Sequence, residues 1–327
     1  MGYRAEKEKI EKKLRVIRLA TLCVVLAAVL GLCLFSAFCP PATWKYYVKK
    51  PDVVKREDGE LRVHFLDVGQ GDCTLIELPD GKVALIDGGD STERTEKTVL
   101  RYLNALKIKT IDYLIVTHAD SDHCGSLATL LQQKTVLNAY LPTTNPTDAG
   151  GAYASMYQEL LEQNTTKIFS ARGEMLAEET SSYTFSFVYP YAEDVESDVG
   201  ESSVAWLDYK GISFIFMADA TVETEEKLIR DSELNFLDNI GVDLRSTEII
   251  KIGHHGSETS SSLEFLQYLQ IKEAVVSCGK NNPYDHPRDK VLENVATAGA
   301  DLYRTDENGT VVVSVKDIGC YSVKTAK

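Results

Sequence analysis

THADSDHCGSL, residues 117–127, places two histidines and two aspartates within six positions, directly after the apolar run YLIVT. A strand that ends here would fix the backbone, and the loop after it can turn short side chains inward. Neutral imidazole together with carboxylate suits zinc, manganese or iron. A solvated acidic turn needs no flanking histidines, so the pattern predicts a metal site. Its candidate ligands are His118, Asp120, Asp122 and His123.

Three other stretches carry similar side chains after apolar runs. KIGHHGSETSS contains His254 and His255, FIFMADA contains Asp219, and KVALIDGG contains Asp87. A lone aspartate after a strand is most often a turn residue. Four such sites in one chain, two of them rich in histidine, favour a shared pocket at one edge of a sheet system.

The pattern from residue 61 onward indicates one folded domain. Short β-branched or apolar runs that end at Gly, Asp or Pro predict strands, and segments such as 92–108 and 152–163 have helical spacing. Strands and helices alternate without a fixed-period repeat. We therefore expect a single α/β domain over residues 61–327.

These motifs together resemble the metallo-β-lactamase superfamily, in which HxxxDH follows an apolar strand and a strand-end Asp and a later His complete the site. Within it they are similar to the metallo-hydrolase domain of ComEC-type competence proteins and their stand-alone relatives. The matching segments are 65–89, 117–127, 216–220, 251–261, 277–287 and 303–311. The resemblance covers nearly all of residues 61–327 and implies an αββα sandwich that carries a metal-dependent hydrolase.

The resemblance also implies a ligand set. His118 and Asp120 would hold one metal and Asp122 and His123 a second, with Asp219 bridging the two. One of the two adjacent histidines would complete the set. Adjacent residues in an extended segment point to opposite faces, so only one of His254 and His255 is expected as a ligand. The other would contact substrate or protonate the leaving group.

One departure from the family pattern bears on the metal. Many members supply a further ligand histidine before the bridging aspartate, but no histidine lies between residues 124 and 253, and Asp120 stands where many members have histidine. The first site is therefore rich in oxygen and short of one ligand, which makes Mn²⁺ an alternative to Zn²⁺. One or two divalent ions remain open.

Further residues are implied beside the metals. The turn DVGQGDC (67–73) lies beside the metals in the related branch, although an ordinary polar turn needs the same residue types. Carboxylates and amides placed there would orient the ligand histidines. The residues expected to support the ligands or contact substrate are Asp67, Gln70, Asp72, Asp87, Ser257 and His286.

The N-terminus predicts a membrane anchor. Residues 19–39 contain no charge, and about 20 apolar residues cross a hydrocarbon core. A cleaved signal peptide would have a shorter apolar region and a small-x-small site. Residues 1–18 carry seven Lys or Arg against three Glu, so this tail is expected in the cytoplasm, with the catalytic domain extracellular. Residues 40–60 read as a juxtamembrane linker.

The predicted function is hydrolysis, because a bound metal lowers the pKa of water and supplies hydroxide at working pH. The branch implies a phosphodiesterase or DNA nuclease, in which Asp122 and His254 or His255 orient the reacting groups. However, residues 40–327 carry a net charge of −18 and no basic stripe with interleaved aromatics. A small cell-envelope or phosphocholine-type ester is therefore an alternative substrate. A catalytically idle binding protein that kept the fold is another alternative, and the oligomeric state stays open.

Overall fold

The computed structural model describes residues 2–38, 40–146, 151–164, 166–173, 176, 182–190 and 202–327. The chain divides into two compact units, Met1–Lys50 and Pro51–Lys327. Residues of the predicted linker join the second unit, because Arg56 Nη1 donates to the carbonyl oxygens of Glu60 and Leu78 at 2.9 and 2.8 Å.

The first unit is dominated by helix α1 (Gly2–Phe38), which is followed by the short 3₁₀ helix η1 (Pro41–Tyr46). Within α1, an 18-residue window of the stretch Glu6–Ala37 has a mean hydropathy of 2.6 and is entirely exposed. By length and composition α1 is a candidate membrane span. The predicted span 19–39 falls within it except for Cys39, which lies outside the described residues.

The second unit contains two sheets, and the larger one has eight strands in the order β14-β13-β1-β2-β3-β4-β5-β6. The strands from β14 to β3 pair antiparallel, and those from β3 to β6 pair parallel. The consecutive hairpins predicted from residue 61 onward are confirmed by this pairing. The strands are β1 (Leu61–Phe65), β2 (Thr74–Glu77), β3 (Val83–Ile86), β4 (Thr110–Ile115), β5 (Thr135–Leu141), β6 (Lys167–Ser170), β13 (Val311–Asp317) and β14 (Cys320–Thr325).

A six-stranded sheet packs against the first, in the order β12-β11-β10-β9-β8-β7. Strands β9 to β12 run parallel, and β7, β8 and β9 pair antiparallel. The strands are β7 (Tyr183–Tyr189), β8 (Val204–Tyr209), β9 (Ile212–Phe216), β10 (Thr247–Lys251), β11 (Glu273–Val276) and β12 (Asp301–Arg304). Apolar side chains of both sheets, such as Phe65, Ile115, Phe185 and Phe214, form the core between them.

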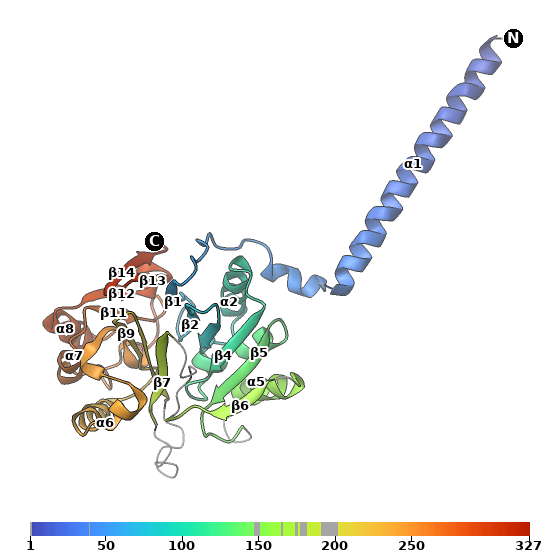
Figure 1. The fold of residues 1–327 in the computed structure, drawn as a ribbon. Helices are drawn as coiled ribbons and strands as arrows, with labels where there is room; N and C mark the ends of the chain where they lie inside the picture. Colours follow the sequence, from blue (N-terminus) through green and yellow to red (C-terminus); the bar gives the residue numbers. More distant parts are fainter. Residues whose placement is uncertain are drawn as a thin grey trace. The chain divides into compact units, whose positions relative to one another are not determined.

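Helices cover the outer faces of both sheets (Figure 1). Helices α2 and α5 lie beside the first sheet, and α6, α7 and α8 bury a second apolar core against the other. This is the predicted αββα sandwich. The helices are α2 (Glu93–Ala105), α3 (Ser121–Cys124), α4 (Leu127–Leu131), α5 (Gly151–Glu162), α6 (Val222–Glu233), η2 (Leu237–Ile240), η3 (Leu244–Ser246), η4 (Gly253–Gly256), α7 (Leu263–Leu269), α8 (Asp289–Ala298) and α9 (Thr305–Asn308).

The parallel strands place the chemistry. Ligand sites of parallel sheets lie beyond the carboxyl ends of the strands. Asp87 follows β3, the segment 117–123 follows β4, Asp219 follows β9, and the two adjacent histidines in η4 follow β10. The predicted motifs therefore leave the two sheets at strand ends.

Candidate metal centre

Asp219 is the centre of the site, and four histidines direct Nε2 toward its carboxylate. Its side chain is 14% exposed. Oδ1 lies 3.2 Å from His123 Nε2 and 3.7 Å from His255 Nε2. Oδ2 lies 3.7 Å from His118 Nε2 and 3.6 Å from His254 Nε2. The structure thus brings together the imidazoles of two segments around the carboxylate of a third.

Asp87 orients the first two imidazoles and is fully buried. Its Oδ2 accepts from His123 Nδ1 at 2.8 Å and from Thr117 Oγ1 at 2.7 Å. Because the Thr117 hydroxyl donates to Asp87, its lone pair accepts the proton of His118 Nδ1, 3.0 Å away. One carboxylate therefore sets both tautomers and leaves both Nε2 lone pairs facing Asp219.

His255 is held in the same way by other partners. Its Nδ1 lies 3.1 Å from the carbonyl oxygen of Ser277, which can only accept, so Nδ1 carries the proton. Asp72 Oδ1 lies 3.2 Å from the same nitrogen, and Asp72 Oδ2 lies 2.8 Å from Lys251 Nζ. The side chains of His255, Asp72 and Lys251 are all buried. Burial raises the pKa of Asp72, but Lys251 and His255 together hold it well below its ordinary value.

His254 differs in being more exposed, with 38% of its side chain accessible. Its Nδ1 lies 2.9 Å from Thr259 Oγ1, which in turn donates to Ser257 Oγ at 3.0 Å. The threonine hydroxyl therefore accepts from Nδ1. Ser257 acts on the site through this relay, which turns His254 Nε2 toward Asp219.

The backbone at the adjacent histidines is not extended, so the expectation that they point to opposite faces was wrong. His254 and His255 lie in η4 with φ of 47° and 53°. The amide of His254 donates to Ala218 O at 2.7 Å and so ties this left-handed turn to the segment that carries Asp219. Ala218 also has a positive φ. Such non-glycine conformations cost energy and concentrate at functional sites, and here they let both rings reach Asp219.

Asp122 and Asp120 lie at the rim of the cluster. Asp122 Oδ2 is 3.2 Å from His255 Nε2, and its side chain is 32% exposed. Asp120 Oδ2 is 3.7 Å from His118 Nε2, with 73% of the side chain exposed. Both predicted ligands thus border the centre, and Asp120 makes the weaker contact.

Glycine allows the turn 67–73 to approach Asp122. A Cβ on Gly71 (φ +126°) would lie 2.3 Å from the Asp122 carbonyl oxygen. The amide of Asp72 donates to that same oxygen at 3.2 Å. This contact delivers Asp72 to His255. The turn therefore supports the centre, as the resemblance implied.

Three predicted supporting residues lie further out. The ion pairs of Asp67 within the described chain are with Arg94 and Lys327, not with the cluster. Gln70 Oε1 accepts from the amide of Gly279 at 3.1 Å and joins two loops. His286 stands edge-on to His254, with ring centroids 5.9 Å apart.

The arrangement fits a divalent cation. Buried polar atoms are nearly always hydrogen-bonded, yet five buried atoms at the centre lack a hydrogen bond. They are Nε2 of His118, His123 and His255, Oδ1 of Asp219, and Oδ1 of Asp72 behind His255. Burial lowers the pKa of His123, but Asp219 and Asp87 raise it well above its ordinary value. An imidazole and carboxylate donor set of this kind suits Zn²⁺ or Mn²⁺.

A compact group of possible donor atoms comprises Asp72, His123, Asp219 and His255. We place Asp72 outside the ligand set, because its two oxygens already face His255 Nδ1 and Lys251 Nζ. Lys251 was missed by the sequence reasoning. The available signal was a lysine at the end of the apolar strand EIIK, directly before the histidine pair.

Residues 66–280 match the family model described as the metallo-beta-lactamase superfamily. The chain belongs to this superfamily. Its members are metal-dependent hydrolases, so the predicted enzyme class is confirmed. A solved structure of the metallo-beta-lactamase fold protein YhfI from Bacillus subtilis has a TM-score of 0.50 and 12% identity, with 80% of this chain and 99% of that chain covered. That likeness supports the fold.

The curated relatives of this chain include competence proteins of the ComEC type. ComE operon protein 3 of Bacillus subtilis (strain 168) is 32% identical over 81% of this chain and 34% of its own length. Competence protein ComA of Neisseria gonorrhoeae is 28% identical over 80% of this chain and 33% of its own length. The chain spans about a third of the length of these relatives. The predicted resemblance is thus confirmed.

Proposed function

We propose that this chain is a membrane-anchored phosphodiesterase that cuts nucleic-acid strands with the help of divalent metal. The observation that carries the proposal is the convergence of four Nε2 atoms on Asp219, with the Nδ1 of each of these histidines hydrogen-bonded to another group. The similarity to proteins named for competence and recombination supports a nucleic acid as substrate.

In this proposal the metal ligands are His118, His123, His255 and Asp219, with Asp120 and Asp122 at the rim. One or two divalent ions held there would polarise a phosphoryl oxygen and make water a stronger nucleophile. Asp87 and Asp72 hold a proton on Nδ1 of His123 and His255, so that in the neutral ring the Nε2 lone pair faces the metal position. They also hold the rings in place before substrate arrives.

Two residues handle protons. Burial raises the pKa of Asp122, but the neighbouring His255 and His123 lower it, so its carboxylate stays ionised. It accepts a hydrogen bond from the attacking water and orients that water. His254 is the most exposed of the four imidazoles, and its Nε2 faces the centre. We assign it to donate a proton from Nε2 to the leaving oxygen.

Chelation tests the proposal. Detergent-solubilised full-length protein is expected to lose more than about 100-fold of its cleavage of a labelled oligodeoxynucleotide after metal removal, and to regain it with Zn²⁺ or Mn²⁺. A double variant Asp122→Ala, His123→Ala should stay inactive after metal is restored. His64→Gln is the matched control, since His64 bonds Tyr102 and Glu77 away from the centre. Cleavage that survives both chelation and the double substitution refutes the proposal.

The second element of the proposal is an extracellular catalytic unit, supported by the basic N-terminal flank of α1. Within the second unit Cys320 is exposed, whereas Cys73, Cys124 and Cys278 are buried, and Cys23 and Cys33 lie in the candidate membrane span. A membrane-impermeant maleimide is expected to label the protein on intact cells, and Cys320→Ser should remove most of that label. Label at Cys320 that appears only after the cells are lysed contradicts this orientation.

A further inference from the structure

The loop after β11 forms a rigid wall beside the metal centre. The Asn282 side chain makes four hydrogen bonds inside this loop. Its Nδ2 donates to the carbonyl oxygens of Gly279 (2.9 Å) and His286 (2.6 Å). Its Oδ1 accepts from the amides of Tyr284 (3.1 Å) and His286 (3.0 Å). The backbone that carries Tyr284 and His286 is therefore held in place.

Three aromatic rings lead outward from the centre, His254 of η4 and then His286 and Tyr284 of this loop. His254, whose Nε2 faces Asp219, stands edge-on to His286 with centroids 5.9 Å apart. The ring of Tyr284 is stacked on His286, with centroids 5.6 Å apart and an interplanar angle of 27°. Tyr284 is nonetheless 54% exposed. Because His286 covers one face of the ring, the exposed surface includes the other face.

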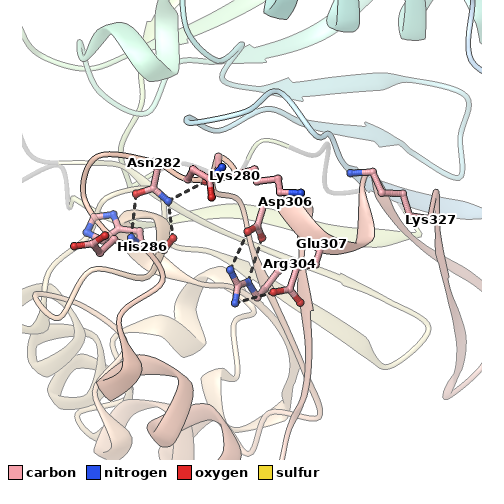
Figure 2. A pocket seen from close by; sticks show the side chains of 10 residues that line it. Lys280, Asn282, His286, Arg304, Asp306, Glu307 and Lys327 are labelled. Atoms are coloured by element: carbon pink, nitrogen blue, oxygen red, sulfur yellow. Dashed lines mark hydrogen bonds and ion pairs between the residues drawn. The ribbon is translucent and has the colours of Figure 1, made fainter.

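The same loop borders a cavity of about 690 Å³. Figure 2 shows His286 and Asn282 at one side of it, Lys327 at the other, and Lys280 between them. Arg304 is paired with Asp306 and Glu307. Lys327 lies 3.4 Å from Asp67 Oδ2.

Lys280 differs from these two cations. It has no ion pair within the described part of the chain and is exposed. Its ammonium group is therefore available to an anion that enters the cavity.

We propose that Tyr284 is a stacking platform for an unpaired nucleobase beside the cleaved phosphodiester, and that Lys280 contacts a phosphate of the same strand. This inference rests on the proposed phosphodiesterase function and names its substrate class as single-stranded nucleic acid. Exposed aromatic rings beside a phosphate-binding cation are the usual means of holding single strands without reading their sequence.

Two physical arguments favour an unpaired strand. A base in a duplex is stacked on both faces, so its face cannot lie on Tyr284 unless the duplex opens. Residues 40–327 also carry a net charge of −18, which opposes duplex binding, because that binding rests largely on Lys and Arg at the phosphates. Stacking supplies affinity without a basic surface, which reconciles a net negative protein with a polyanionic substrate.

The test compares two strands of equal length and charge, oligothymidylate and an abasic oligomer, by fluorescence anisotropy with full-length protein and Ca²⁺ in place of the catalytic metal. Wild type is expected to bind oligothymidylate about 10-fold more tightly than the abasic strand. Tyr284→Ala should lose this preference, and Tyr284→Phe should keep it. Lys280→Gln should weaken binding of both strands and lower the salt dependence by about 0.7 in the log–log slope.

The outcomes separate this inference from the proposed function. If wild type cuts strands but Tyr284→Ala keeps the full preference for bases, the platform is refuted while the phosphodiesterase stands. A further variant, Tyr284→Leu, has an apolar side chain without a ring. If it keeps the preference as Tyr284→Phe does, the contact is apolar burial and stacking is refuted. A base preference that depends on Tyr284 in a protein that cuts no strand supports the platform and refutes the phosphodiesterase.

Discussion

Asp219→Asn is expected to lower both hydrolysis and divalent-metal affinity by more than about 100-fold, the upper end of the loss seen when an outer-shell partner is removed. Burial raises the pKa of Asp219, but His123, His255 and His118 lower it well below its ordinary value, so the carboxylate is ionised. The amide keeps the shape and removes the charge. It also turns an NH₂ group toward Nε2 lone pairs that should face a cation.

Asp120→Asn is the matched control for this prediction. Asp120 makes the same kind of contact, a carboxylate oxygen 3.7 Å from His118 Nε2, but its side chain is 73% exposed. Its substitution should lower metal affinity much less, as measured by competition with a chromogenic chelator. If the two variants lose affinity equally, the centre is organised around His118 and not around Asp219.

The residues at strand ends were predictable because histidines clustered with aspartates after apolar runs are more than an ordinary turn needs. THADSDHCGSL and the aspartate of FMADA follow apolar strands, and parallel strands deliver such residues to one edge. The fold followed from the same motifs. Asp87 was also predictable as a supporting group, although its double role toward His118 and His123 needs the position of the Thr117 hydroxyl.

Other features depended on backbone geometry that no pattern contains. Alternation assumes extended chain, so it failed at His254 and His255, where a left-handed turn carries both rings inward. Asp67 and Asp72 lie in one turn and look equivalent in sequence. Only the approach of Gly71 to Asp122 sends Asp72 into the centre and leaves Asp67 beside Lys327. Contacts distant in sequence decide such choices.

Lys251→Met is expected to destabilise the second unit by about 3–5 kcal/mol, the cost of leaving one partner of a buried ion pair unpaired. Lys251 and Asp72 are 2.8 Å apart, and their side chains are 2% and 6% exposed. Denaturant unfolding followed by the fluorescence of Trp206, which is buried in β8, measures this loss. Lys272→Met is the control, because Lys272 is 61% exposed and lies 3.5 Å from its partner Glu248. Its cost should stay below about 1 kcal/mol.

The double variant Lys251→Met, Asp72→Asn separates the role of the pair in stability from its role at the metal. Removing both charges leaves no unpaired buried ion, so much of the lost stability should return. Metal affinity should stay about 10–100-fold below wild type, because His255 Nδ1 has lost its carboxylate. Recovery of both properties would mean that Ser277 O alone orients His255. If neither stability nor metal affinity returns, Lys251 stabilises the unit by its packing, because the loss of the ion pair with Asp72 then does not explain the effect of Lys251→Met.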